Sequence, residues 1–302
     1  MVIFSVIICT RNRASYLADA IRSIQEQDFP SNAFEIVIVD NGSTDDTRQV
    51  VLSFVGMGIP CVYVTEPVLG LPRARNTGAR ASRGEILAYI DDDALAERDW
   101  LKELAAAYQE VAEKPVIVGG KSELLWEGER PSWITDELLP YLSDNTHLGE
   151  VERVLGEGEY PVGVNMSIRR EQLQKYGGFD TSLRPYGNDE VELCQRLRAS
   201  GGEVVYVPQA RVRHRVSVGR VTIKYFMDRF FRQGAADVVL EQKINPKNNI
   251  SSLRTILSMA IIFIDGIKFI SYFIIGQQNQ SYKSLFTLSG RLGRLKIQTS
   301  MK

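Results

Sequence analysis

The chain has 302 residues, 44% of them hydrophobic, and a formal net charge of −1 at pH 7. This composition suffices for one large domain or a domain with an appendage, and it excludes disordered, collagen-like and disulfide-rich proteins. A charge so near zero gives no reason to expect nucleic acid as a partner. Cys9, Cys61 and Cys194 are widely separated and are interpreted as reduced thiols, and no signal-peptide pattern precedes the first apolar run. We therefore expect a cytoplasmic protein.

The first 120 residues alternate short apolar runs with amphipathic helical patterns. The apolar runs predict strands at residues 4–9, 35–40, 61–65, 85–91 and 116–119. Short connections between alternating strands and helices predict an α/β fold with a doubly wound, mainly parallel sheet.

The middle of the chain is less regular. Residues 121–159 carry prolines, tryptophans and acids without one period, so we expect irregular structure with a short helix near residues 136–142. Regular patterns then return and predict strands at residues 162–168 and 203–207 and helices at residues 170–176 and 189–199.

The C-terminal part changes character. Residues 255–276 are apolar over about the length that spans a bilayer, yet Asp265 and Lys268 lie near the middle, where each charge is costly in hydrocarbon. Three interpretations stay open: a helix on or in a membrane surface, a true span or re-entrant hairpin, and a helix docked on protein. No acid follows Asp265, whereas these basic residues do: Lys268, Lys283, Arg291, Arg294, Lys296 and Lys302. This cationic tail favours an anionic membrane surface as a partner.

The most distinctive feature is the acidic triplet Asp91-Asp92-Asp93, which follows the apolar run at residues 86–90. Like charges at the end of a buried strand are costly unless a cation or ligand uses them, and ligands of open α/β sheets bind at strand ends. Side chains at i and i+2 of an extended segment point the same way. Asp91 and Asp93 therefore form a pair of hard oxygen ligands that suits Mg²⁺ or Mn²⁺. A solvated turn or a helix cap is the alternative.

Polar loops follow the first two predicted strands at the same edge of the sheet. Residues 9–13 and 40–46 carry side chains able to contact a nucleotide, and Asp40 is able to accept a hydrogen bond from a base. Arg73, Arg75 and Arg80 share one short helical segment before the acidic strand, where some are expected to face a nucleotide or to balance the carboxylates. Each segment alone is also compatible with ordinary loop or surface chemistry.

A second acidic group opens the helix predicted at residues 189–199. Asp189, Glu190 and Glu192 follow a Gly-Asn turn. Acids in a first helical turn are favoured by the helix dipole whether or not they act in catalysis. Three acids in four positions exceed what a cap requires, so one of them is a candidate general base.

In their order and spacing, these segments resemble the inverting family 2 glycosyltransferases of the GT-A fold. The segments are SVIICTRNR, IVIVDNGSTDDT, LPRARNTGARASRGEILAYIDDDA, GVNMSIRRE, GGFD and NDEVELCQRLRASG. The resemblance covers about residues 3–235. It implies a glycosyltransferase domain at residues 1–240, with a nucleotide-sugar half at 1–120 and an acceptor half at 121–240. An apolar helical and basic, membrane-associated extension would follow at residues 241–302.

The resemblance implies roles for individual residues. Asp91 and Asp93 resemble the outer residues of the Asp-x-Asp motif, which bind the ribose and the metal that bridges the donor diphosphate, and Asp92 is expected among the donor contacts. Asp40 resembles the residue that contacts the nucleobase. The other implied donor-pocket positions are Thr10, Arg11, Arg73 and Asn76.

Asp189-Glu190 stands where the family has a Glu-Asp pair whose Asp is the catalytic base. The base position falls on Glu190, and the choice between Glu190 and Asp189 stays open. His214 resembles a metal ligand of some relatives, although a lone His among arginines is also typical of a surface residue.

The resemblance therefore predicts an inverting transfer, assisted by Mg²⁺ or Mn²⁺, from a nucleotide-diphospho-sugar to a hydroxyl of a glycan or lipid-linked acceptor. A UDP-sugar is the expected donor. Such relatives commonly build surface polysaccharides or glycolipids, which predicts a protein at the inner face of the cell membrane, attached peripherally or through its C-terminus. Two alternatives are an inactive membrane-docked scaffold of the same fold and a sugar nucleotidyltransferase, whose Gly-rich, Lys-containing phosphate loop is missing here.

Overall fold

The computed structural model describes residues 2–110, 115–183, 187–245 and 252–300. The chain divides into two compact units. The first comprises Met1–Leu125, Ser143–Thr181 and Asp189–Arg215, and the second comprises Trp126–Leu142, Ser182–Asn188 and Val216–Lys302. Every candidate site residue named above lies in the first unit. The domain boundary expected at residue 240 stays a prediction.

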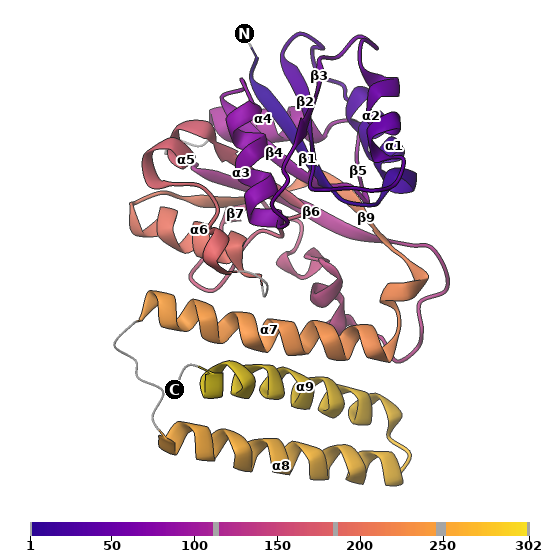
Figure 1. Ribbon diagram of the computed structural model, residues 1–302, viewed down its shortest axis with the longest axis vertical. Coiled ribbons are helices and arrows are strands. Elements are labelled where there is room, and N and C mark those ends of the chain that lie inside the picture. Colours follow the sequence, from indigo (N-terminus) through magenta and orange to yellow (C-terminus); the bar gives the residue numbers. More distant parts are fainter. Residues whose placement is uncertain (1, 111–114, 184–186, 246–251, 301–302) are drawn as a thin grey trace. The chain divides into compact units, whose positions relative to one another are not determined.

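The first unit is built on a sheet whose described strands follow the order β3-β2-β1-β4-β8-β6-β9-β5, with β7 paired to β9 (Figure 1). Its parallel strands are β1 Phe4–Thr10, β2 Phe34–Asp40, β3 Cys61–Thr65 and β4 Ile86–Asp91. The register aligns Thr10 with Asp40 and Cys9 with Asp91, so the carboxyl ends of β1, β2 and β4 meet at one edge. The expected α/β fold with a mostly parallel central sheet is confirmed.

Both faces of β1, β2 and β4 are buried, which explains why their sequences are almost continuously apolar, whereas β3 at the edge of the sheet is only partly buried. The helices of this unit are α1 Ala14–Gln25, α2 Thr47–Phe54, α3 Leu71–Ala81, α4 Trp100–Glu110, α5 Arg170–Tyr176 and α6 Asp189–Ala199. On one face, Val6 and Ile8 belong to a core shared with α1, α2 and α4. On the other face, Ile7 and Tyr89 belong to a core shared with α3, α5 and α6. Helices on both faces make the sheet doubly wound.

The remaining strands pair in antiparallel fashion where the register is defined. They are β5 Ala94–Ala96, β6 Ile117–Trp126, β7 Arg153–Val154, β8 Asn165–Arg169 and β9 Val204–Val216. Asn165 is a fully buried junction among them. Its Nδ2 donates to the carbonyl oxygens of Lys121 at 2.9 Å and Ala210 at 2.8 Å, and its Oδ1 accepts from Trp100 Nε1 at 2.9 Å. One side chain therefore ties β8 to β6, β9 and α4.

Two strands are longer than the sequence predicts. Strand β6 continues to Trp126 where irregular structure was expected, and β9 continues to Val216 rather than ending near residue 207. The distal half of β9 alternates exposed arginines with buried residues, so its period of two is visible only once the buried side is known. The short helix expected at residues 136–142 is present as a 3₁₀ helix. The 3₁₀ segments are η1 Asp136–Leu142, η2 Thr146–Leu148, η3 Thr181–Leu183 and η4 Val218–Arg220.

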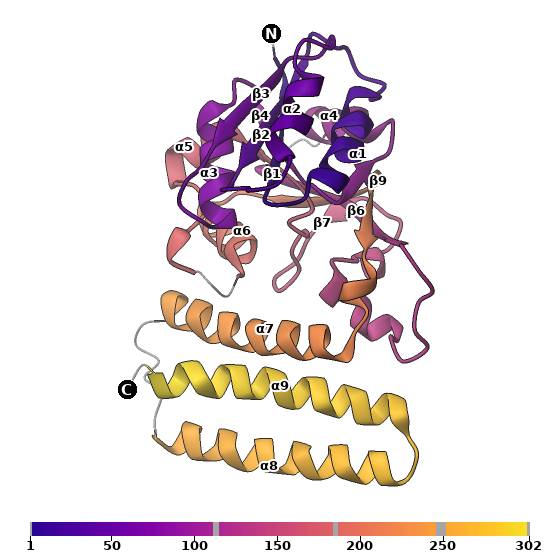
Figure 2. The same ribbon diagram turned by 45° about the vertical axis from the view of Figure 1, so that its right-hand side comes forward.

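Among the described residues, the second unit contains three long helices: α7 Ile223–Ile244, α8 Ser252–Ile274 and α9 Gln278–Ser300. Figures 1 and 2 both show α9 lying between α7 and α8. Glycines let α7 and α9 approach closely, because a Cβ at Gly234 would lie 1.9 Å from the carbonyl oxygen of Gly290 and one at Gly293 1.9 Å from that of Phe231. Along the described ranges, no helix combines the length and the apolar character needed to cross a bilayer.

Candidate active site

The acidic triplet lies where β4 ends. Asp91 is the last residue of β4 and β5 begins at Ala94, so Asp92 and Asp93 form the turn between these strands. Strand β9 runs antiparallel to β5 and aligns His214 with Ala94. The backbone N–H of Arg215 donates to the carbonyl oxygen of Asp93 at 2.9 Å, which holds the turn against β9. The sheet therefore brings His214 beside the triplet although the two are far apart in sequence.

Asp91, Asp93 and His214 form a three-ligand group in which one ligand atom from each lies within 4.8 Å of the others. His214 Nε2 is 3.2 Å from Asp93 Oδ1, and both side chains are buried. Carboxylate oxygens suit Mg²⁺ and Mn²⁺, and an imidazole nitrogen adds a ligand common to transition metals. The residues present thus fit a divalent cation, and His214 lies inside β9 rather than on the surface after a strand.

Arg13, in the loop after β1, forms ion pairs with the triplet. Its Nη1 makes a close ion pair with Asp93 Oδ2 and lies 3.7 Å from Asp92 Oδ1. Asp92 is buried and accepts a hydrogen bond from the Thr10 hydroxyl at 2.7 Å. Burial raises the pKa of Asp92 to about 7, although Arg13 opposes the shift. Asp92 is therefore tied into the turn by a hydroxyl and a guanidinium from the first strand and its loop.

The second acidic group, at the start of α6, is bound by Arg75 from α3. Arg75 is buried, and its Nη1 donates to Asp189 Oδ2 at 2.8 Å and lies 3.7 Å from Glu190 Oε2. Its guanidinium carbon is 5.2 Å from the ring centre of Phe179, and its Nη2 donates to the carbonyl oxygen of Gly163 at 3.4 Å. The Asp189 side chain is buried, whereas that of Glu190 is 28% exposed. Glu190 is therefore the member of the pair that a substrate can reach.

The electrostatics connect the two acidic groups. Burial and the neighbouring Glu190 raise the pKa of Asp189, while Arg75 lowers it. Burial alone would lower the pKa of Arg75, but Asp189, Glu190 and Asp91 together raise it. Arg75 thus interacts with the carboxylates of α6 and with the end of β4. The expectation that an arginine of this helix balances carboxylates is met by Arg75.

Comparison with known proteins gives the family. The model described as "Glycosyl transferase family 2" matches residues 5–177, more than half of this chain. The chain belongs to glycosyl transferase family 2. A second model, described as "N-terminal domain of galactosyltransferase", matches residues 155–220. The protein is therefore a glycosyltransferase, and the resemblance carried by its motifs is confirmed.

Similar proteins agree with this assignment. A glucosyl-dolichyl phosphate glucuronosyltransferase of Haloferax volcanii is 28% identical over 246 residues, which cover 78% of this chain and 77% of that protein. A validoxylamine A glucosyltransferase of Streptomyces hygroscopicus subsp. jinggangensis is 28% identical over 223 residues, which cover 66% of this chain and only about half, 52%, of that protein. The solved structure of the mannosyltransferase PcManGT from Pyrobaculum calidifontis, in complex with GDP-Man and Mn²⁺, matches with a TM-score of 0.62 at 19% identity, covering 96% of this chain and 86% of that one. The GT-A fold is thereby confirmed.

In this glycosyltransferase, Asp40 is the last residue of β2 and is buried. Its Oδ1 accepts the backbone N–H of Ser43 at 2.7 Å, and its Oδ2 accepts the Tyr63 hydroxyl at 2.6 Å. Each carboxylate oxygen has a second lone pair, so these bonds orient Asp40 and leave it able to accept from a base. Its contact with the nucleobase stays a prediction, as does a donor contact of Thr10.

The other expected donor residues lie on the loop after β1 and on α3. Arg11 and Arg73 are exposed. The Asn76 side chain binds the backbone of Phe179: Nδ2 donates to its carbonyl oxygen and Oδ1 accepts its N–H, each at 2.8 Å. Asn76 therefore fixes the segment that carries the ring under Arg75. Donor contacts of these three residues of the glycosyltransferase stay predictions.

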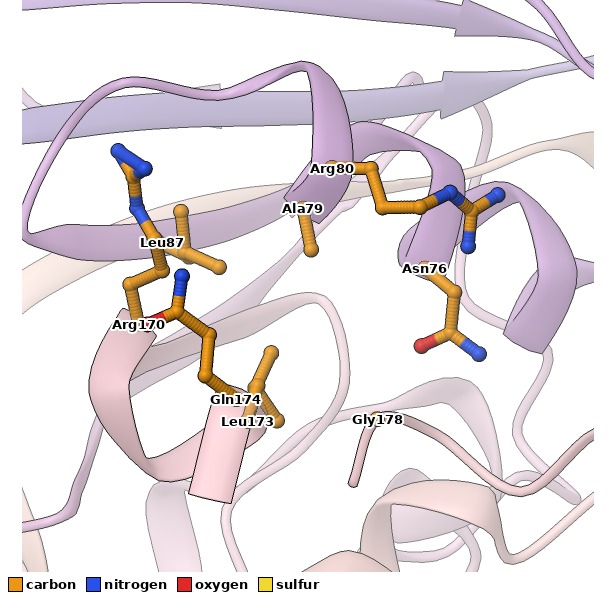
Figure 3. A pocket seen from close by; sticks show the side chains of 8 residues that line it. All are labelled: Asn76, Ala79, Arg80, Leu87, Arg170, Leu173, Gln174 and Gly178. Atoms are coloured by element: carbon orange, nitrogen blue, oxygen red, sulfur yellow. The ribbon is translucent and has the colours of Figure 1, made fainter. Parts of the chain in front are cut away.

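Asn76 also lines a pocket of about 460 Å³ between α3 and α5 (Figure 3). Figure 3 shows Arg80 and Arg170 on opposite sides of this pocket. Its full lining is Asn76, Ala79, Arg80, Leu87, Arg170, Leu173, Gln174 and Gly178. Leu87 precedes Asp91 by four residues in β4, a distance of roughly 13 Å along a strand. The pocket therefore lies toward the other end of β4 and is separate from the acidic triplet.

Sequence reasoning missed several residues of the site. Arg13 gave no signal beyond its place in a polar loop, and Tyr63 reads as an ordinary core residue of an apolar strand. Gly163 lies against the α6 pair, since a Cβ there would be 2.5 Å from Arg75 Nη2 and 3.3 Å from Glu190 Oε1. The glycine thus leaves room for the guanidinium beside the candidate base.

Proposed function

We propose that this glycosyltransferase carries out a metal-assisted, inverting transfer of a sugar from a nucleotide-diphospho-sugar to a hydroxyl of an acceptor. The proposal rests on two groups that lie in the same unit: the ligand group Asp91, Asp93 and His214, and the accessible carboxylate of Glu190. Arg75 connects them, because it lies 3.7 Å from Glu190 and interacts electrostatically with Asp91. The PcManGT structure with GDP-Man and Mn²⁺ supports a nucleotide-sugar donor and a divalent ion. The sequence resemblance favours a UDP-sugar.

Asp91, Asp93 and His214 would hold Mg²⁺ or Mn²⁺, which when bound supplies positive charge to the departing diphosphate. Arg13 adds a fixed positive charge beside Asp93. The Thr10 hydroxyl and Arg13 hold Asp92 in the turn, so the outer carboxylates keep their relative positions. The loop after β1 therefore organises the ligand group.

Glu190 is the proposed general base. Inversion in one displacement needs a carboxylate that takes the proton of the acceptor hydroxyl as its oxygen bonds to the anomeric carbon, while the bond from that carbon to the diphosphate breaks and the electron pair leaves with the nucleotide. Glu190 is partly exposed, whereas Asp189 is buried and bonded to Arg75. Asp189 is therefore assigned the role of orienting Arg75 beside the base.

The test is nucleotide-sugar turnover by Glu190→Gln across UDP- and GDP-sugars with Mg²⁺ and Mn²⁺. Turnover is expected to fall by about 10²- to 10⁴-fold, the usual contribution of a general base, while donor binding by calorimetry is retained. Glu171→Gln is the matched control, because Glu171 is an exposed acid in the first turn of α5. Near-normal turnover of Glu190→Gln would move the base to Asp189 or elsewhere. A product with retained anomeric configuration would contradict inversion, and release of pyrophosphate would indicate a nucleotidyltransferase.

For the acceptor, we infer a glycan or a lipid-linked sugar at the cytoplasmic face of a membrane, in surface polysaccharide or glycolipid synthesis. The name of the Haloferax volcanii relative, a glucosyl-dolichyl phosphate glucuronosyltransferase, supports a lipid-linked acceptor. Transfer to a polyprenyl-phosphate-linked sugar should exceed transfer to the same sugar carried on a soluble aglycone. Equal transfer to both would contradict recognition of the lipid.

A further inference from the structure

Helix α8 exposes an apolar stripe, formed by Met259, Phe263, Ile267, Ile270 and Ile274. Their spacing of four, four, three and four residues places them along one face of a helix. All five are exposed, Phe263 by 71% and Ile274 by 74%. Apolar side chains gathered in one exposed patch mark an interaction surface, whereas single exposed ones need no explanation.

The opposite side of α8 packs on α9. Asp265, about 200° around the helix from Phe263, is buried there with Oδ2 3.0 Å from Arg291 Nε. The carbonyl oxygen of Phe269 accepts the Ser281 hydroxyl at 3.5 Å. Figures 1 and 2 show α9 on one side of α8, with α7 beyond it. The stripe is therefore the side of α8 that faces away from the other long helices of this unit.

The C-terminal part of the chain, from residue 245 onward, is strongly basic. From residue 245 onward the sequence has one acid, Asp265, and these eight basic residues: Lys247, Arg254, Lys268, Lys283, Arg291, Arg294, Lys296 and Lys302. Three of these basic residues have acidic partners within the unit: Arg291 pairs with Asp265, Arg294 with Glu241 and Lys283 with Glu137. With one acid against eight basic residues, this stretch of the chain still keeps a net positive charge. Lys268 is exposed and directly follows Ile267 of the stripe, so its long side chain can carry its charge to the edge of the apolar face.

We propose that α8 binds the surface of an anionic lipid bilayer through the apolar stripe. Large apolar side chains on one helix face, with basic residues beside them, are the composition of helices that lie at the boundary between headgroups and acyl chains. Basic residues close to an anionic surface add about fivefold in affinity each. The proposal goes beyond the sugar-transfer reaction, which uses residues of the first unit.

The charge distribution favours lipid over a second copy of this chain. A two-fold contact between two stripes would bring two positive segments together, with both Asp265 carboxylates already engaged. Anionic headgroups supply the negative charge that such a contact lacks. The occupant that the surface fits is thus a bilayer rather than an identical helix.

The test is cosedimentation of the full chain with vesicles of equal parts phosphatidylglycerol and phosphatidylcholine, and with vesicles of phosphatidylcholine alone. The wild-type protein should prefer the anionic vesicles and dissociate from them at high salt. Phe263→Ser/Ile270→Ser should weaken binding by at least about tenfold, because two large apolar side chains no longer leave water. Lys268→Glu, a single substitution of an exposed residue, should weaken binding to the anionic vesicles but not to the phosphatidylcholine vesicles.

Leu52→Ser/Met57→Ser is the matched control, since it removes two exposed apolar side chains of the first unit and should bind vesicles like the wild type. Unchanged binding of the α8 variant, or equal binding of the wild type to both vesicle types, would overturn the proposal. A wild-type dimer that the α8 substitutions convert to a monomer, measured by light scattering without lipid, would assign the stripe to a second copy instead. Nucleotide-sugar turnover in lipid-free buffer separates this result from the proposed reaction, because the α8 substitutions should leave it unchanged.

Discussion

Replacement of Arg75 by methionine should destabilise the first unit strongly. Arg75 and Asp189 are both buried and lie 2.8 Å apart, so Arg75→Met leaves an aspartate in the interior without its counter-charge. Breaking a buried ion pair from one side costs about 3–5 kcal/mol of unfolding free energy. Methionine keeps an apolar stem near Phe179, so loss of packing contributes little of this figure.

The pH dependence of the loss has a definite sign. Burial and Glu190 raise the pKa of Asp189 above its unfolded value, and removal of Arg75, which lowers that pKa, should raise it further. A carboxyl with a raised folded pKa stabilises the fold while it is protonated, and this contribution is lost as pH rises through the folded pKa. The unfolded-state pKa is the same in both proteins, so their difference in stability changes only between the two folded-state pKa values of Asp189. The Arg75→Met variant should therefore regain stability relative to the wild type as pH falls toward about 7, which is the folded-state pKa of Asp189 in the wild type.

Urea unfolding followed by the fluorescence of Trp100 measures this effect. Trp100 is buried in the first unit, whereas Trp126 and Trp133 belong to the second and are replaced by phenylalanine in every protein compared. Arg98→Met is the control, because Arg98 pairs with Asp28 at 3.5 Å in an exposed position, where a pair contributes less than about 1 kcal/mol.

A double substitution tests whether Arg75 acts as the counter-charge of Asp189. Arg75→Met/Asp189→Asn removes the stranded charge together with its partner, so it should be more stable than Arg75→Met alone. A loss below about 1 kcal/mol for Arg75→Met, or simple addition of the two single effects, would refute the view that the arginine compensates a buried charge.

Three further predictions concern the site and the sheet. Gly163→Ala should lower nucleotide-sugar turnover at least about tenfold, measured with saturating donor, since a Cβ 2.5 Å from a guanidinium nitrogen must displace it; unchanged turnover would show that the guanidinium position is unimportant. Asn165→Ala should cost about 3 kcal/mol in urea unfolding, because three buried hydrogen bonds are lost at once, and a cost under about 1 kcal/mol would contradict this. Asp93→Asn should abolish calorimetric Mn²⁺ binding while the unfolding midpoint is retained, and persistent binding would remove Asp93 from the ligand group.

Features set by local sequence were predictable. The helices at Arg170–Tyr176 and Asp189–Ala199 have the predicted bounds, because a Gly-Gly pair follows the end of each. Strands β1, β2 and β4 were predictable because burial on both faces leaves a continuous apolar run. The structure brings the carboxylates of Asp91 and Asp93 within reach of one ion, but it does so through the turn at Asp92 and Asp93 and not through the extended segment that the sequence argument assumed.

Features that depend on long-range pairing were not predictable to the same extent. The distal part of β9 carries exposed arginines, so its strand character depends on pairing with β5, and His214 reaches Asp93 through that register. The choice of Arg75 rather than Arg73 as the buried partner of Asp189 depends on how α3 packs beside α6. The residues next to Arg75 in the sequence do not indicate this contact, because it is selected by the free energy of burying two charges together in the folded protein.

The glycine contact between α7 and α9 has a mechanical consequence. The backbones of α7 and α9 are in contact at Gly234 and Gly293, so neither helix can rotate or slide without a steric collision, and the two form a rigid pair. Helix α8 is connected to α9 by a tight turn. In this turn Gly276 has a φ of +76°, and the N–H of Gln277 donates to the carbonyl oxygen of Tyr272 at 2.9 Å. The apolar stripe of α8 is therefore held in one orientation about the helix axis, and it needs no ordering step before it binds.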